Sequence, residues 1–198
     1  MKIFGIENNE VPLVRFNLTI DGGQLLESMD KLGLANLTAS LLNKGTQNKT
    51  TQELEEAIQD LGASLFSYAG KESITISGTT LAKNYKATLA LAQEMILSPR
   101  FDESDFELLK KATISSLRQQ QANPNAVARN AYNELIYGKE NIRAKNTLGT
   151  IPSVSKITIE DVICIWCDNP CNLHYIFKNL TPSLNLNSLL ENKSHYSV

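Results

Sequence analysis

The alternation of apolar and polar residues along the chain predicts three β-strands. Between Val11 and Asp21 every second residue is apolar, as in a half-buried strand. Two further strands are expected at Ala63–Ala69 and Glu72–Thr80, and the short connection Gly70-Lys71 between them suits an antiparallel hairpin. Three strands are few for a sheet of this kind, and Lys2–Ile6 is a candidate for a fourth.

Apolar residues spaced three and four positions apart predict helices in the rest of the chain. Helices are expected at 31–43, 50–62, 84–97, 104–121, in a segment ending at 137, and from 158 onward. Thr50, Ser104 and Thr158, each followed three residues later by Glu or Asp, are predicted to cap three of these helices. Hairpin-linked strands and clustered helices together predict an α+β fold, an antiparallel sheet with helices packed on one face.

Composition and charge narrow the class of protein. The chain has 198 residues, 42% of them hydrophobic, and a formal net charge of −2, which argues against wholesale disorder and against nucleic acid as the main partner. No run of apolar residues is long enough for a membrane span. The N-terminus lacks the pattern of a signal peptide, so a cytoplasmic location is expected, or a periplasmic one if the chain derives from a longer exported protein.

The segment from Gly33 to Thr46, GLANLTASLLNKGT, resembles the signature helix of the insulinase/pitrilysin family of zinc metallopeptidases, which includes the mitochondrial processing peptidases. In that family the helix reads roughly G-L-A-H-x-x-E-H, followed by apolar residues and K-G-T. Supporting matches occur in the same order at Val11-Pro12-Leu13-Val14, Gly22-Gly23, Leu61-Gly62-Ala63, Ser98-Pro99-Arg100-Phe101, Asn123-Pro124, Tyr137-Gly138 and Leu148-Gly149-Thr150. The resemblance implies a peptidase half-domain of this type at residues 1–161 and a divergent or truncated tail at residues 162–198.

The residues that perform the family's chemistry are missing. In H-x-x-E-H the two histidines bind zinc, the glutamate is the general base, and a glutamate on a later helix is the third ligand. The resemblance places these roles at Asn36 and Ser40 for the histidines, Ala39 for the base, and Ser116, 76 residues after Ser40, for the third ligand. Amide and hydroxyl groups do not replace imidazole and carboxylate around zinc, and alanine accepts no proton. We therefore assign no catalytic, cofactor-binding or metal-binding residue and predict that the chain alone is inactive.

Within the family, such losses are typical of the non-catalytic half that closes a peptide chamber. The resemblance therefore implies a structural and peptide-chamber partner of a zinc-bearing half in proteolysis, present here as a fragment, split product or truncated copy. An exposed strand edge is expected to hold an extended peptide by strand addition. Two alternatives stay open: a stand-alone protein- or peptide-binding module, and a non-functional remnant of a zinc protease.

The cysteines form a separate question, because all three lie near the C-terminus. Cys164, Cys167, Cys171 and His174 offer zinc-binding side chains, but they are crowded into eleven residues and no second ligand pair follows. We favour a divergent tail, with a metal site as the open alternative. No histidine precedes His174, so the region that resembles the family lacks the usual general base at neutral pH.

Overall fold

The computed structural model describes residues 11–168, which fold into a three-stranded antiparallel sheet and seven α-helices. The strands are β1 (Leu13–Asp21), β2 (Ser64–Ala69) and β3 (Ser73–Leu81). The helices are α1 (Leu34–Leu42), α2 (Thr51–Asp60), α3 (Tyr85–Leu97), α4 (Glu103–Gln121), α5 (Pro124–Tyr137), α6 (Ile151–Lys156) and α7 (Ile159–Asp168). β3 is the central strand, and β1 and β2 are the two edges.

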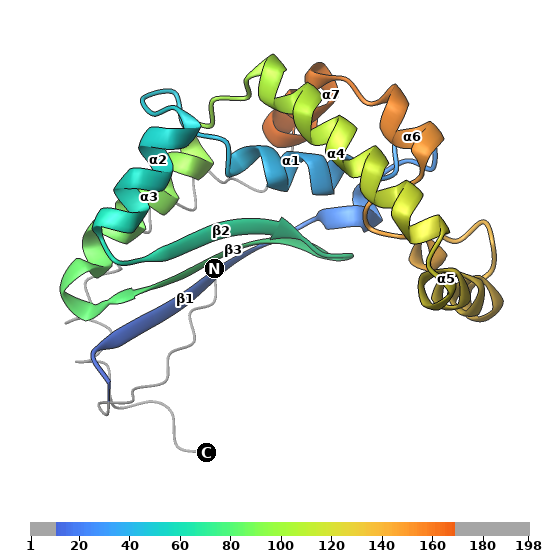
Figure 1. Ribbon diagram of the computed structural model, residues 1–198, viewed down its shortest axis with the longest axis horizontal. Helices are drawn as coiled ribbons and strands as arrows, with labels where there is room; N and C mark the ends of the chain where they lie inside the picture. The colour runs from blue at the N-terminus through green and yellow to red at the C-terminus, as the bar shows by residue number, and fades with distance from the viewer. Residues whose placement is uncertain (1–10, 169–198) are drawn as a thin grey trace.

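Helices α1, α2 and α3 pack on one face of the sheet and α5 lies beyond its end, an arrangement that confirms the predicted α+β class (Figure 1). Apolar residues form two clusters beneath them. The first joins the sheet to α2 and α3 through Ile20, Leu54, Leu65, Ile76, Ala92, Met95 and Ile96. The second joins α1 to α4, α6 and α7 through Leu34, Leu37, Leu41, Phe106, Leu117, Val154, Ile157, Ile159 and Val162. The second cluster therefore fixes the helix that the sequence marks as the site.

Local signals in the sequence account for most of the element boundaries. The hairpin predicted at Gly70-Lys71 is present, and the Gly70 N–H donates to the Ser73 carbonyl across 2.7 Å. The capping box at α2 also forms: the Glu53 N–H donates to Thr50 Oγ1 at 3.3 Å, and the Thr50 N–H donates to Glu53 Oε2 at 2.8 Å. Both predictions are confirmed.

The predicted start of α4 was wrong by two residues, because its N-cap is a different side chain. Asp102, not Ser104, is the N-cap, and its Oδ1 accepts from the backbone N–H groups of Ser104 and Asp105 at 3.0 and 3.3 Å. A carboxylate is a strong acceptor beside the positive end of a helix dipole, which explains why the aspartate takes the capping position. Helix α6 was not predicted from the sequence.

The C-terminal end of the described chain packs on the rest of the domain. Helix α7 crosses the predicted boundary after residue 161, Val162 is buried, and Trp166 Nε1 donates to the Ile96 carbonyl at 3.2 Å. The division into residues 1–161 and 162–198 stays a prediction. The candidate strand Lys2–Ile6 lies outside the described residues. None of the described helices combines the length and the apolar character that crossing a bilayer requires.

Candidate functional site

Helix α1, which carries three of the four degenerate positions, is the most deeply buried helix of the domain. Seven of its nine residues are buried. It begins at Gly33, whose backbone φ of 99° favours glycine, and a side chain there would place its Cβ 2.6 Å from the Leu148 carbonyl oxygen. Gly33 and the Leu148-Gly149-Thr150 segment are therefore in contact, and the close approach of the two backbones requires glycine at position 33.

A buried carboxylate holds the first turn of α1. Glu27 is 8% exposed, and its two oxygens accept from the Gly33 N–H at 2.9 Å and the Ala35 N–H at 2.6 Å. Burial raises the pKa of Glu27 to about 7, although the two backbone N–H groups favour its charged form. Glu27 therefore caps the first turn of α1. It also has a pKa near neutral pH, in a part of the chain that contains no histidine.

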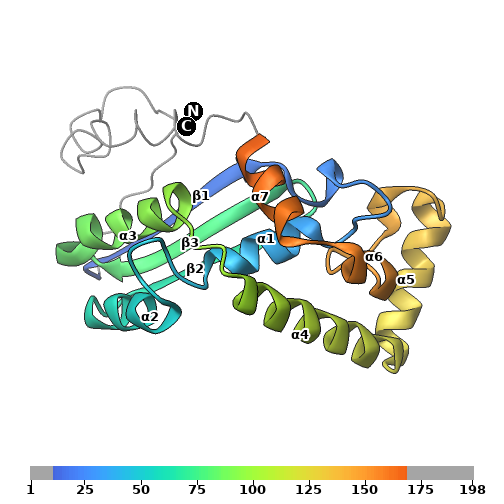
Figure 2. The same cartoon turned by 90° about the horizontal axis from the view of Figure 1, so that it is seen from above.

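The four positions that the resemblance assigns to the family's zinc site lie on two helices that contact each other. Asn36 and Ser40 are half-buried on α1, one helical turn apart, and Ala39 between them is fully buried. Ser116 lies on α4, which runs beside α1 (Figure 2), and is exposed. The two helices that carry these positions are therefore present. The four side chains at the positions offer only amide, methyl and hydroxyl groups.

Other metal-binding chemistry is also missing from the described part of the chain. Among residues 11–168, no three His, Cys, Asp or Glu side chains gather closely enough to hold a metal ion. Cys164 is exposed on α7. The other members of the predicted Cys/His cluster, Cys167, Cys171 and His174, lie outside the described side chains, so their interpretation is unchanged.

The C-terminal end of α1 is fixed to the edge strand β2 by polar contacts. Asn43, the residue after α1, accepts from the Ser67 N–H at 2.8 Å, and its amide nitrogen donates to the Ser67 carbonyl at 3.0 Å. The Ser67 hydroxyl donates to the Ala39 carbonyl. The backbone at the former base position is thus part of a structural link between α1 and β2.

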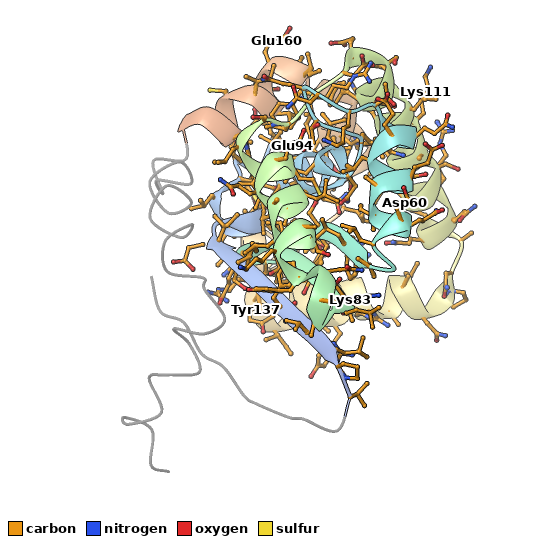
Figure 3. The ribbon with its side chains drawn as sticks, turned by 90° about the vertical axis from the view of Figure 1, so that its left-hand side faces the viewer. Asp60, Lys83, Glu94, Lys111, Tyr137 and Glu160 are labelled. Atoms are coloured by element: carbon orange, nitrogen blue, oxygen red, sulfur yellow. The ribbon has the colours of Figure 1, made fainter. Side chains whose placement is uncertain are left out.

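The loop after α1 is anchored to α3 through one carboxylate, Glu94, which is labelled in Figure 3. Glu94 accepts from Lys49 Nζ at 2.7 Å, Thr46 Oγ1 at 2.8 Å and Asn48 Nδ2 at 3.1 Å. Although burial opposes the charged form, these three donors hold the pKa of Glu94 below its usual value. Glu94 is therefore a charged structural residue at neutral pH.

Helix α5 has the opposite arrangement, with its apolar side in solvent. Its outward residues recur at helical spacing and are all exposed: Val127, Ala128, Ala131, Tyr132, Leu135 and Ile136. Its inward side carries Glu134, which pairs with Lys145 at 3.0 Å. Beyond its end an open groove of about 550 Å³ runs between Leu25, Glu27 and Met29 on one wall and Tyr137, Gly138, Glu140, Asn141 and Ile142 on the other.

Sequence reasoning missed Glu27, Asn43 and the outward face of α5. Glu27 had a detectable signal, because α1 begins at glycine with no Ser, Thr, Asp or Asn to cap it, which leaves its first N–H groups in need of another acceptor. Asn43 had a weaker one, a polar residue directly after the buried pair Leu41-Leu42. The exposure of the apolar side of α5 could not be predicted, because the sequence does not indicate which side of this helix packs against the domain.

Comparison with known proteins agrees with the resemblance. The sequence pattern of the family described as Insulinase (Peptidase family M16) matches residues 3–148. The chain is 25% identical over 156 residues to a Helicobacter pylori protein named "Non-peptidase homolog YmxG", a match covering 79% of this chain and 36% of that protein. It is 24% identical over 143 residues to the probable mitochondrial-processing peptidase subunit beta of Arabidopsis thaliana, covering 72% of this chain and 27% of that protein.

Solved structures show the same fold. A crystal structure described as a peptidase M16 inactive domain from Pseudomonas fluorescens superposes with a TM-score of 0.75 at 23% identity, covering 81% of this chain and 39% of that chain. A protease from Helicobacter pylori gives a TM-score of 0.71 at 17% identity, covering 77% and 37%. The chain thus spans about a third of the length of the curated relatives it matches, the shares being 36% and 27%.

Proposed function

Because the chain belongs to the insulinase family, M16, we propose that it is a catalytically inactive domain that serves as structural and peptide-chamber partner of a zinc-bearing half in proteolysis. The observation that carries the proposal is the state of α1. The fold that presents the zinc motif is intact, and the motif positions hold Asn36, Ala39 and Ser40. Alanine at position 39 accepts no proton, and residues 11–168 contain no histidine, so the motif positions on the described helices offer no group suited to activating water for hydrolysis.

The names of the relatives support a non-catalytic role within an assembly. The Helicobacter pylori relative is named as a non-peptidase homolog, and the processing-peptidase relatives are named as subunits. Relatives of both kinds fit a protein that keeps the peptidase fold and depends on another polypeptide for hydrolysis. The stand-alone binding module is the alternative that the experiment below separates from this proposal.

The uncovered face of the sheet supports the role as a chamber wall. In the described chain no helix covers this face (Figure 1). Phe66 and Tyr68 of β2 are exposed there, with ring centroids 6.0 Å apart, and Asn17 and Thr19 of β1 are exposed on the other side of the central strand. A flat surface of aromatic rings, amides and hydroxyls suits contact with an extended polypeptide of varied sequence.

The exposed face of α5 supports a protein partner. Tyr132 is 62% exposed and Leu135 is 85% exposed, and both lie in the apolar stripe of α5. Contiguous apolar surface of this kind is typical of protein–protein contacts. We propose that the zinc-bearing half covers this stripe.

The test begins with a search of the adjacent reading frames for an M16 subunit that carries H-x-x-E-H, and such a subunit is then mixed with this chain. We expect the mixture to cleave a fluorogenic peptide at least about tenfold faster than the zinc-bearing subunit alone, because a closed chamber positions substrate. Leu135→Asp should abolish this gain without changing the melting temperature, whereas Asn130→Asp on the same helix should preserve it. Cleavage that is unchanged on mixing would contradict the proposal and favour a stand-alone module.

A further inference from the structure

The edge of β2 has a simple repeat of outward-facing backbone groups. The Gly70 N–H donates to the Ser73 carbonyl of β3, so Gly70 and Ser73 form a hydrogen-bonded pair. Along an antiparallel ladder, hydrogen-bonded pairs alternate with pairs whose backbone groups point away from the partner strand. The N–H and C=O groups of Leu65, Ser67 and Ala69 consequently point away from β3. A peptide added to this edge would have to pair with these three residues, of which Ser67 is the central one.

The central position is already occupied by the side chain of Asn43. A carboxamide has one acceptor oxygen and an N–H donor in the same plane, as a peptide group has. The Asn43 amide makes with Ser67 the pair of bonds that a neighbouring strand makes, accepting at 2.8 Å and donating at 3.0 Å. Asn43 therefore imitates one residue of an added strand.

Two further features hold Asn43 in this position. The Ser67 hydroxyl is buried and donates to the Ala39 carbonyl, so both the backbone and the side chain of Ser67 bond to α1 or to the residue that follows it. Helix α1 itself lies alongside β2 in both views (Figures 1 and 2). Adjacent strands are spaced about 4.8 Å apart, so an incoming strand would need the space that the Asn43 side chain fills.

We propose that Asn43 determines whether this domain accepts an extended peptide on β2, and that it closes this edge to strand addition. The inference depends on contacts within the chain and not on the proposed partner role. The proposal takes the place of the strand addition expected from the sequence. Peptides would then bind at the uncovered face of the sheet and not at the β2 edge. The proposal also explains how an edge strand avoids pairing with other chains.

The experiment compares two fluorescein-labelled decapeptides of alternating valine and lysine, one unmodified and one with alternate backbone nitrogens methylated. Methylation removes the N–H groups that strand addition needs and leaves the side chains. Fluorescence anisotropy should give equal affinity for the two peptides with the unsubstituted chain. With Asn43→Ala the unmodified peptide should bind at least about tenfold more tightly than the methylated one, as expected for two regained hydrogen bonds.

Asn36→Ala is the matched control, since it removes the same side chain from the first turn of α1, seven residues before Asn43. It should leave both affinities unchanged. A preference of the unsubstituted chain for the unmodified peptide would overturn the proposal, as would the lack of any preference in Asn43→Ala.

A measurement on the unsubstituted chain covers the case in which Asn43→Ala does not fold. Amide hydrogen exchange should be slower at Ser67 than at Leu65 and Ala69, because only the Ser67 N–H has the Asn43 oxygen as its acceptor. Equal exchange at the three amides would show that the Asn43 contact does not persist in solution, and the proposal would fail.

Discussion

Helices α1 and α5 both carry apolar stripes, but the domain covers the first and leaves the second in solvent. Seven of the nine residues of α1 are buried, whereas no residue of the fourteen in α5 is. Polar contacts by Glu27 and Asn43 hold the two ends of α1, while the contacts of α5 include the Glu134–Lys145 ion pair and Lys71 Nζ, 5.8 Å from the centroid of the Tyr137 ring. The comparison indicates that α1 is part of the hydrophobic core, while the apolar stripe of α5 is the surface that we propose for a protein partner.

The largest expected effect comes from truncating the apolar stripe of α1. Leu37 is fully buried in the second apolar cluster. Leu37→Ala should lower the free energy of unfolding by about 2–5 kcal/mol, because it removes buried methyl groups and leaves a cavity. Urea denaturation followed by circular dichroism measures this change.

Leu135→Ala is the matched control on α5, where the leucine is 85% exposed. It should change the free energy of unfolding by less than about 0.5 kcal/mol. Similar losses for the two substitutions would contradict the assignment of α1 to the core and α5 to the surface.

A smaller but more specific effect concerns pH. The pKa of Glu27 rises from 4.5 to about 7 on folding, so the folded chain binds this proton more tightly than the unfolded chain. The resulting stabilisation is complete below pH 4.5 and is lost as the pH rises through 7, a change on the order of 3 kcal/mol.

The Glu27→Gln variant isolates this contribution. Other carboxylates have lowered pKa values and affect both proteins alike, so the difference between the two stability curves reports Glu27. Denaturation at a series of pH values should show the unsubstituted chain losing its advantage over Glu27→Gln between pH 4.5 and about 7. A difference that does not vary with pH would show that the pKa of Glu27 is the same in the folded and the unfolded chain.

The smallest expected effect is local to α5. Asn123 caps this helix, accepting from the Asn125 N–H at 3.0 Å. Asn123→Ala should cost about 1 kcal/mol of local helix stability. Because α5 buries none of its residues, we expect faster amide exchange within α5 and an unchanged global melting temperature. A fall in the melting temperature would mean that α5 folds as one unit with the core.

The fold was largely predictable because its signals are local. Alternation between Val11 and Asp21, the hairpin at Gly70 and the capping box at Thr50 depend on neighbours in sequence. The cap at Asp102 was missed because Ser104, two residues later, has the Ser-x-x-Glu pattern of a capping box with Glu107. Helix α6 was missed because it has only six residues, too few for a helical period to show.

The candidate site divides in the same way. The degenerate positions Asn36, Ala39 and Ser40 could be located because they are contiguous in one motif. The Asn43–Ser67 contact joins residues 24 positions apart, and no pattern in the sequence specifies it. The raised pKa of Glu27 comes from burial, which depends on the packed structure.

The central claim, that this chain keeps the helices of a zinc peptidase without the groups that bind zinc, can be tested by restoring those groups. The substitutions Asn36→His, Ala39→Glu, Ser40→His and Ser116→Glu should be made together, in a chain whose Cys164, Cys167 and Cys171 are replaced by serine. After equilibration with zinc and dialysis, this variant should retain about one zinc ion per chain, since two imidazoles and a carboxylate form a typical site. The same serine-substituted chain without the four changes should retain almost none. Stoichiometric zinc in that chain, or no zinc in the restored one, would contradict the account.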